Sequence, residues 1–598
     1  MAKNNLFKEL DVSNKVSRNG FNLSNVNRFT AKCGELLPVY HKAVIPGDKF
    51  RMSVNSFTRT APVQTAAFTK FKEYYDWFFV PYRLLGKQIP QILAKNVKNP
   101  PIASSSTSNQ PVGTNLPFVN LNEIYGISVE GPRYLRNLGQ FTNEFGFNRA
   151  HLSAKLLSYL GYCYFSDDQV TELLGTGNYR LPYEKNLRVS LLPLMAYQKI
   201  YYDFYRNTQW EDNVPYNYNV DYMGTDAHFY VQPTMSGGSL NPYYDNPTLF
   251  DLRYANYPKD LFMGLLPNSQ YGDEAVMEVD YNETASFVNL ETSNGELVQV
   301  GESNVNNNEA QHAIEGLNGS DLTYQSKLGI NLVNGLNALK GSISVLEARK
   351  ARALQKYKEI LGSGDLDYQT IIRKIFNVNI PDTLADHCQY LGGSSFVVNI
   401  SEVENTNLND NQSAIQRGKG VGSGNGDMVD FESKEYGVVM CIYHVAPIID
   451  YALTGVHFDV TKVDADDYPN PVFDNLGYVE FPTHYLTNSP LGTEEVPANF
   501  LGYTTRYFDA KTSVDVTNGD FRVSLKDWIS PLDDDYLMKR PNHIYTELDY
   551  TFFKINPAVC DRIFGVNVNE KVNTDQFRVS ATFNVNAVRN LNYLGVPF

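Results

Sequence analysis

The chain has 598 residues, of which 42% are hydrophobic and 20% are charged, so it can bury a substantial core and is not globally disordered. Its net charge of −15 argues against a dedicated duplex-DNA binder, although it is compatible with one locally basic face. The five cysteines are scattered and form no CxxC pair, which indicates folding in a reducing compartment without a disulfide framework.

Aromatic residues are unusually frequent at 13% of the chain, with 41 Tyr and 34 Phe. Tyrosine offers a large rigid contact area with one polar tip, which suits subunit interfaces and carbohydrate-facing surfaces. A β-rich fold that uses aromatic residues as strand formers would account for part of the same excess.

The N-terminal region is basic. Residues 1–60 hold ten Lys or Arg and four Asp or Glu, a local charge of +6. A polar basic arm over residues 1–30 can contact phosphates, because each neutralised phosphate releases a counterion. A solvated tail that packs on a neighbouring subunit fits the same residues.

The first fifteen residues lack the apolar core of a signal peptide. No apolar run approaches the roughly 18 residues that span a bilayer. We therefore expect a soluble chain, made in the cytoplasm, with no membrane insertion.

The first predicted strands lie early in the chain. Residues 50–54 alternate between apolar and polar side chains, which predicts a half-buried strand. Residues 74–80 (YYDWFFV) are apolar on both faces and predict a buried central strand, stopped by Pro81. Residues 96–120 are rich in Pro, Ser and Asn and predict a long surface loop.

The middle of the chain contains two helical patterns followed by a long polar stretch without a regular period. Residues 151–160 and 191–206 carry apolar and aromatic residues at helical spacing and predict helices. From Trp210 to about Ser326, Asn, Tyr, Gly, Pro and acidic residues dominate without a sustained period. Because a structureless loop of this length is unusual in a compact domain, we expect residues 212–325 to form a projecting insertion with short strands.

A helix is predicted to start at a capping box formed by Ser344 and Glu347 and to end at Gly362. Its apolar positions fall on one face. Its cationic face is either solvated or in contact with nucleic acid; it consists of Arg349, Arg352 and Lys356.

The C-terminal third returns to strand patterns. Strands are predicted at residues 396–400, 436–445, 521–525 and 577–587, and residues 418–427 (GKGVGSGNGD) predict a flexible glycine-rich loop. Many strands with long connections indicate a mainly β, antiparallel sandwich with insertions.

The sequence contains no motif that specifies catalytic chemistry. The glycine-rich run lacks the GK[ST] ending of a phosphate-binding loop. Cys441 and His444 have odd spacing on a strand pattern and should point to opposite faces. The acidic clusters at 464–467 and 533–535 do not match a calcium-binding loop and are expected to be surface turns. We expect no enzyme activity, cofactor or metal.

Four blocks of sequence, in this order, resemble the major capsid proteins of the Microviridae. The first combines residues 37–50 (LPVYHKAVIPGDKF), 57–62 (FTRTAP) and 74–85 (YYDWFFVPYRLL). The others lie within residues 353–406, 435–477 and 501–528. The chain is most similar to the gokushovirus-like and gut Bacteroidetes-associated branches, from whose compact members the long stretch after Trp210 departs.

The resemblance implies an eight-stranded antiparallel jelly roll over residues 31–598, with long inter-strand insertions containing some helices. It also implies about sixty copies in a T=1 icosahedral shell around a circular single-stranded DNA genome. The implied partners are the chain itself, the genome, scaffolding and pilot or minor spike proteins, and a host cell-surface receptor. The implied location is the virion, after synthesis in the bacterial cytoplasm.

Two sets of residues are candidates for binding, one for the genome and one for the host receptor. The candidate single-stranded DNA contacts are Lys3, Lys8, Lys15, Arg18 and Arg28. The candidate receptor-facing residues of the insertion are Tyr216, Tyr218, Tyr222, Tyr243 and Tyr244. The alternative is a secreted or surface β-sandwich protein that binds or cleaves glycans, which the aromatic and acidic composition also fits.

Overall fold

The computed structural model describes residues 18–65, 67–94, 116–125, 134–175, 187–222, 248–273, 275, 345–366, 368–381, 385–403, 417–474, 476–488, 500–533, 549–564 and 574–593, and the backbone of six short strands between 235 and 330. The chain divides into two compact units, residues 1–269 with 364–598, and residues 270–363.

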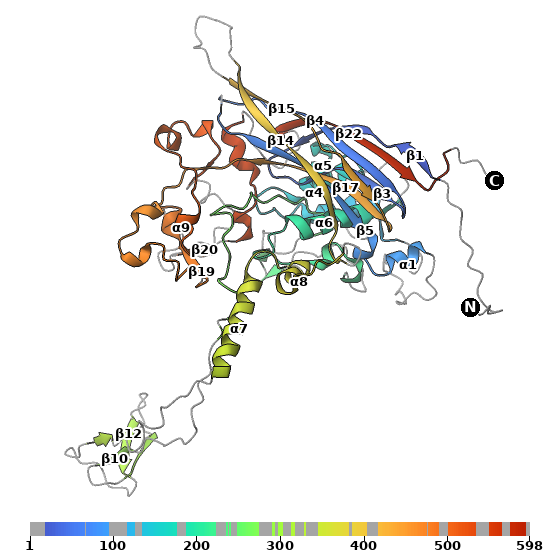
Figure 1. Cartoon of the computed structure of the whole chain (residues 1–598). Helices are drawn as coiled ribbons and strands as arrows, with labels where there is room; N and C mark the ends of the chain where they lie inside the picture. Colours follow the sequence, from blue (N-terminus) through green and yellow to red (C-terminus); the bar gives the residue numbers. More distant parts are fainter. Residues whose placement is uncertain are drawn as a thin grey trace, which may run out of the picture. The chain divides into compact units, whose positions relative to one another are not determined.

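An antiparallel sheet of ten strands dominates the larger unit (Figure 1). Its main path runs β1-β22-β4-β15-β14-β5-β17-β3, while β2 pairs with β22 and β16 pairs with β4. The bounds are β1 Asn19–Asn22, β2 Asn25–Ala31, β3 Leu37–Val44, β4 Lys49–Thr60, β5 Phe71–Pro81, β14 Gln389–Val403, β15 Arg417–Asn425, β16 Val429–Glu432, β17 Gly437–Pro447 and β22 Phe577–Arg589. Because strands from both ends of the chain are neighbours, the sheet is complete only when the last segment has joined the first.

The burial of the strands follows the sequence pattern. Buried residues of β4 alternate with exposed or half-buried ones along its whole length, as expected for a strand with one covered face. Every residue of β17 is buried: β5 and β3 flank it in the sheet, and helix α6 packs on it. The strands predicted at 50–54, 74–80, 396–400, 436–445 and 577–587 are confirmed.

Helices of the larger unit cover one face of the sheet (Figure 1). Helix α4 (Arg149–Tyr159) packs on β3, and α6 (Leu192–Ile200), continued by a π-helical turn at Tyr201–Tyr205, packs on β5 and β17. These two helices confirm those predicted at 151–160 and 191–206. The Asn148 side chain caps α4 by accepting a hydrogen bond from the Ala150 N–H.

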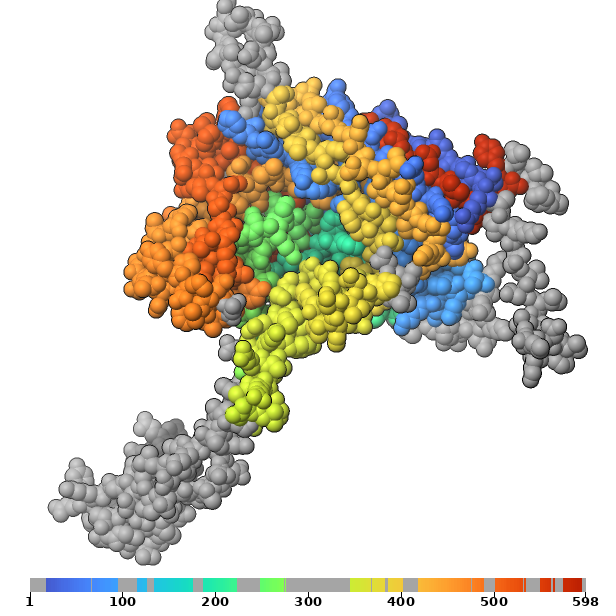
Figure 2. Space-filling view, in the orientation of Figure 1, coloured from blue at the N-terminus to red at the C-terminus, as the bar shows by residue number. Residues whose placement is uncertain are grey.

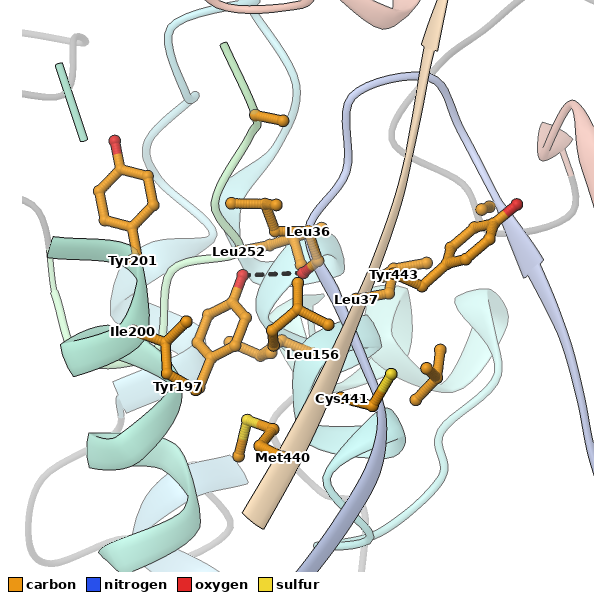
Figure 3. Close-up of a cluster of buried hydrophobic side chains, with 14 of the residues drawn as sticks. Leu36, Leu37, Leu156, Tyr197, Ile200, Tyr201, Leu252, Met440, Cys441 and Tyr443 are labelled. Atoms are coloured by element: carbon orange, nitrogen blue, oxygen red, sulfur yellow. Dashed lines mark hydrogen bonds between the residues drawn. The ribbon is translucent and has the colours of Figure 1, made fainter. Parts of the chain in front are cut away.

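The core between helices and sheet combines aliphatic and tyrosine side chains (Figure 3). Leu156 of α4, Tyr197 of α6 and Met440 of β17 are all buried in it. The Tyr197 hydroxyl donates a hydrogen bond of 2.9 Å to the Leu36 carbonyl, so the one polar atom of this ring is satisfied inside the core.

The other elements of the larger unit are short. The helices are α1 Ile89–Leu93, α2 Leu121–Tyr125, α3 Tyr134–Leu138, α5 Asp167–Gly175, α8 Tyr368–Phe376 and α9 Phe508–Lys511. The strands are β6 Phe118–Asn120, β7 Arg188–Ser190, β8 Met235–Ser236, β9 Ser239–Leu240, β18 Asp450–Tyr451, β19 Tyr478–Pro482, β20 Phe500–Thr505 and β21 Pro531–Leu532.

The glycine-rich run at residues 418–427 is not the flexible loop predicted, since most of it forms strand β15. Its alternate glycines face the covered side of the sheet. A Cβ on Gly420 would overlap the side chain of Thr60, and one on Gly424 would overlap the ring of Phe396. The glycines therefore leave room for side chains of neighbouring strands, a requirement set by residues distant in sequence.

Residues 521–525 also differ from the prediction, which was a strand. They lie in and between 3-10 turns at Gly519–Arg522 and Lys526–Trp528. The N–H groups of Val523 and Leu525 both donate to the Asp520 carbonyl. Alternation alone does not make a strand, because a strand also needs a hydrogen-bonded neighbour.

The unit of residues 270–363 contains a four-stranded sheet, β12-β11-β10-β13, and helix α7. The bounds are β10 Leu290–Thr292, β11 Leu297–Glu302, β12 His312–Gly316, β13 Leu328–Ile330 and α7 Val345–Gly362. Helix α7 confirms the helix predicted between the capping box and Gly362. Much of its apolar stripe is exposed, including Leu346, Leu354 and Tyr357. Among the described helices, none has the length and hydropathy that crossing a bilayer requires.

Candidate functional site

A buried ionic cluster ties the two ends of the chain to the helical layer. The Lys155 Nζ of α4 lies 2.7 Å from Glu35 Oε2 and 2.8 Å from Asp575 Oδ2, and all three side chains are almost fully buried. Burial disfavours the charged form of Lys155, but the two carboxylates more than offset this and hold its pKa above the ordinary value. Because one ammonium holds carboxylates from both ends of the chain, the cluster is a structural clamp.

Cys441 and His444 were predicted to point to opposite faces of a strand. In β17 they pair with Trp77 and Tyr74 of β5. The two residues of each strand are three positions apart, and residues at odd spacing on a strand point to opposite faces, as predicted. The His444 ring stacks on Tyr74, with centroids 4.7 Å apart. Burial lowers the pKa of His444 to about 3, so this imidazole is neutral at pH 7. No group of three His, Cys, Asp or Glu residues in the described part of the chain is arranged to hold a metal ion.

A cavity of about 350 Å³ lies between α4, the residues after Trp210 and the segment around Lys554. Its cations already have protein partners. Arg149 is paired with Asp251, and the Lys554 Nζ lies 3.3 Å from Glu144 Oε1. The walls are thus neutralised by the chain itself and are not organised around a ligand charge.

An exposed apolar and acidic surface covers residues 456–476, which we call the acidic lobe surface. Val463 and Val472 are 83% and 77% exposed, and these neighbours are exposed as well: Val456, Val460, Tyr468, Phe473 and Leu476. The segment contains five aspartates and one lysine. Several exposed apolar side chains within one short segment suit a protein interface, whereas the exposed apolar residues of a free monomer are scattered singly.

Buried rings support this lobe from below. Phe458, Phe481 and Phe508 pack edge to face or tilted, with centroids 5.2 to 5.6 Å apart. In Figure 2 the orange residues of this region form a lobe at the border of the larger unit. The packed phenylalanine rings therefore hold the backbone that carries the exposed valines.

The two acidic clusters behave differently. Residues 464–467 form an exposed 3-10 turn with a capping box, as the prediction of a surface turn requires. Asp533 of the second cluster is instead buried, 3.2 Å from the Lys526 ammonium, so for this residue the prediction is wrong. Asp534 and Asp535 lie outside the described residues.

Of the five candidate DNA contacts, Lys3, Lys8 and Lys15 lie outside the described residues. The exposed Arg18 donates from Nε to the Asn590 side chain at 3.2 Å. Arg28 is exposed on β2, where it pairs with Ser580 of β22. The structure thus associates the two described arginines with the last strand.

The candidate tyrosines of the insertion divide into three groups. Tyr218 is buried in the larger unit, 5.4 Å from the Tyr202 ring centroid and under the Lys199 ammonium. Tyr216 is half-buried and Tyr222 is 63% exposed. Tyr243 and Tyr244 lie outside the described residues. The compact second unit begins at Gln270, whereas the predicted insertion begins at residue 212.

Sequence reasoning missed the buried clamp and the acidic lobe surface. Lys155, Glu35 and Asp575 are far apart in sequence, and no local signal connects them. The valines next to aspartates at 459–460 and 463–464 were a usable signal for the lobe, because apolar side chains are placed among charges in a region without strand or helix period.

A model of a known family, described as "Capsid protein (F protein)", matches residues 11–116 and 179–598. The match includes all ten strands of the large sheet and the acidic lobe surface. No curated protein matches the chain.

Proposed function

The chain belongs to the F capsid protein family of the Microviridae, and we propose on this premise that about sixty copies assemble into a T=1 icosahedral shell around a circular single-stranded DNA genome. The observation that carries the proposal is the family match over most of the chain. The fold is the mainly β jelly roll with insertions that the resemblance implied.

The acidic lobe surface supports a role in assembly. A shell subunit must bury large patches against differently placed copies of itself, and such interfaces have an apolar centre with a polar rim. Exposed valines surrounded by aspartates have this character. We propose that residues 456–476 contact a neighbouring subunit.

The genome and the other virion components are further parts of the proposal. The net charge of −15 means that any contact with DNA must be made by a local group of cations. The basic arm of residues 1–30 is one such group. Scaffolding and pilot or minor spike proteins are expected partners, as is synthesis in the bacterial cytoplasm before incorporation into the virion.

Host attachment is proposed for the insertion, residues 212–325. Because Tyr218 is buried, it is the exposed Tyr222 and the residues beyond it that are open to this role. Replacing residues 281–325 of this insertion by a short Gly-Ser linker should give particles that assemble but do not adsorb. Loss of assembly would instead assign the segment to the shell.

Electron microscopy of negatively stained particles tests the shell. Uniform particles a few hundred ångströms across, which yield nuclease-protected single-stranded DNA on extraction, are expected. Dispersed subunits at every concentration, with glycan-hydrolysing activity, would favour the alternative of a glycan-active β-sandwich.

A further inference from the structure

The face of the large sheet opposite the helices is open over strands β2, β22, β4 and β15. Figure 1 shows α4 and α6 on the other side, and in Figure 2 bands of blue, orange and red mark these strands at the surface. The exposed side chains of β4 are those of Lys49, Arg51, Asn55, Phe57 and Arg59. Within the described residues no second layer covers these side chains, so the face is accessible to a partner.

Strand pairing gathers four cations at one end of this face. Arg578 of β22 is directly opposite Arg59 of β4. Arg59 is in turn opposite Val421 of β15, and Lys419 lies two residues before Val421 on the same face. Arg28 of β2 pairs with Ser580, the next outward residue after Arg578. We call Arg28, Arg59, Lys419 and Arg578 the basic end of the sheet.

The two ends of this face differ in how their charges are compensated. At the far end, the Arg51 Nε lies 3.1 Å from Asp430 Oδ1 and the Lys49 Nζ lies 3.1 Å from Glu432 Oε2. Both carboxylates come from β16, which does not extend to the basic end. Within the described residues, no carboxylate is within ion-pair distance of the four cations of the basic end.

The pair of Arg59 and Arg578 is unfavourable for an isolated subunit. Cβ atoms of directly opposed residues are about 5 Å apart, and like charges in that position destabilise a sheet. An anion placed between the two guanidinium groups would remove this repulsion. The arrangement therefore fits a polyanionic partner better than it fits solvent.

An aromatic side chain lies within the same rows. Phe57 is 41% exposed and stands between Ser580 and Ser423 on the adjacent strands. The Arg59 guanidinium carbon lies 5.1 Å from the centre of its ring. An exposed ring flanked by cations and small hydroxyls is the combination that holds unpaired bases by stacking and phosphates by charge.

We propose that the basic end of the sheet binds single-stranded nucleic acid without reading its sequence, with the four cations on phosphates and Phe57 stacked on a base. This inference rests on the proposed function and deepens it, because it assigns a genome contact to the folded sheet, which shares Arg28 with the N-terminal arm and adds Arg59, Lys419 and Arg578. Unpaired bases are free to stack on Phe57, whereas those of a duplex are not, so a single strand is the preferred ligand.

The test measures binding of the full-length chain to a fluorescently labelled oligo-dT and to a duplex of the same length, as a function of salt. The wild type should bind the single strand more tightly. The variant R59Q/R578Q should bind more weakly, and the slope of log K against log salt should fall by about 1.4, since each phosphate contact on a single strand contributes about 0.7. F57A should weaken binding roughly 5- to 150-fold with the slope unchanged.

The matched control is K49Q/R51Q, which removes the same charge from the compensated end of the same face and should leave the slope unchanged. An unaltered slope for R59Q/R578Q, or an equal loss in the control, would overturn the inference. So would normal DNA binding combined with loss of particles, because the face would then join two copies of the chain.

Failure of this inference and failure of the proposed function can be distinguished by electron microscopy of the same preparations. If wild-type particles contain DNA and R59Q/R578Q binds single-stranded DNA as tightly as the wild type, only the proposed DNA contact of the sheet is refuted. If the wild type forms no particles, the proposed shell function is refuted.

Discussion

Replacing Gly420 by alanine is expected to destabilise the subunit, because β15 packs with its glycines against neighbouring strands. A Cβ at this position would meet the Cβ, Cγ2 and Oγ1 atoms of the buried Thr60. It would also disturb the 2.8 Å hydrogen bond from the Gly420 N–H to Thr60 Oγ1. Overpacking of this kind costs about 1–3 kcal/mol and the lost hydrogen bond adds about 1 kcal/mol. The lower entropy of alanine in the unfolded chain offsets about 0.4–1 kcal/mol.

The net loss should therefore be about 2 kcal/mol, read from urea unfolding of unassembled subunits. S423A, on the exposed side of the same strand, is the control and should stay within about 0.5 kcal/mol of the wild type. The double variant G420A/T60A should lose less than the sum of the single variants, since removing the threonine side chain makes room for the methyl group. If G420A and S423A were equally harmless, the glycine run would be the flexible loop first expected, and the packing argument would be refuted.

Four further outcomes are expected. K155M should lower the unfolding free energy by about 3–5 kcal/mol in urea titrations, because two buried carboxylates lose their cation; a loss below 1 kcal/mol would contradict the clamp. The folded pKa of His444 is depressed to about 3, so its contribution to stability is full above pH 6.5 and falls by about 1.4 kcal/mol per pH unit as pH drops toward 3. Comparing H444Q with the wild type across this range should isolate that slope, and parallel curves would count against it. V463R should leave subunit unfolding within about 0.5 kcal/mol of the wild type but abolish particles in electron micrographs, and normal particles would exclude the lobe from the shell contacts. Y218A should destabilise the subunit while Y222A should not, and reduced adsorption of Y222A particles would support the receptor role; two equally stable variants would argue against the packing of Tyr218.

The sequence predicted the parts of the fold that depend on local pattern. The strands β4 and β22 carry a strict period of two, and β5 and β17 are apolar on both faces, so each was recognisable without knowing its neighbours. Helix α7 was likewise marked by its capping box and terminal glycine. These features are properties of consecutive residues.

What the sequence could not predict depends on partners distant along the chain. The glycine-rich sequence of β15 predicts a loop. Its strand conformation follows from the side chains of Thr60 and Phe396, which occupy the space that the glycines leave. Residues 521–525 alternate like a strand, but they pair with no strand among the described residues. Register brings Arg59 and Arg578 face to face although more than five hundred residues separate them, so the basic end of the sheet could not be found from composition.

The most direct test of the account is the protein mass of particles purified from the producing bacterium, measured by native or charge-detection mass spectrometry after removal of the DNA. The subunit mass is 67.6 kDa, so a shell of about sixty copies should give about 4 MDa from this chain, before accessory proteins are added. Particles of another copy number would contradict the T=1 shell, and a chain found only as free 67.6 kDa subunits would contradict the capsid function itself.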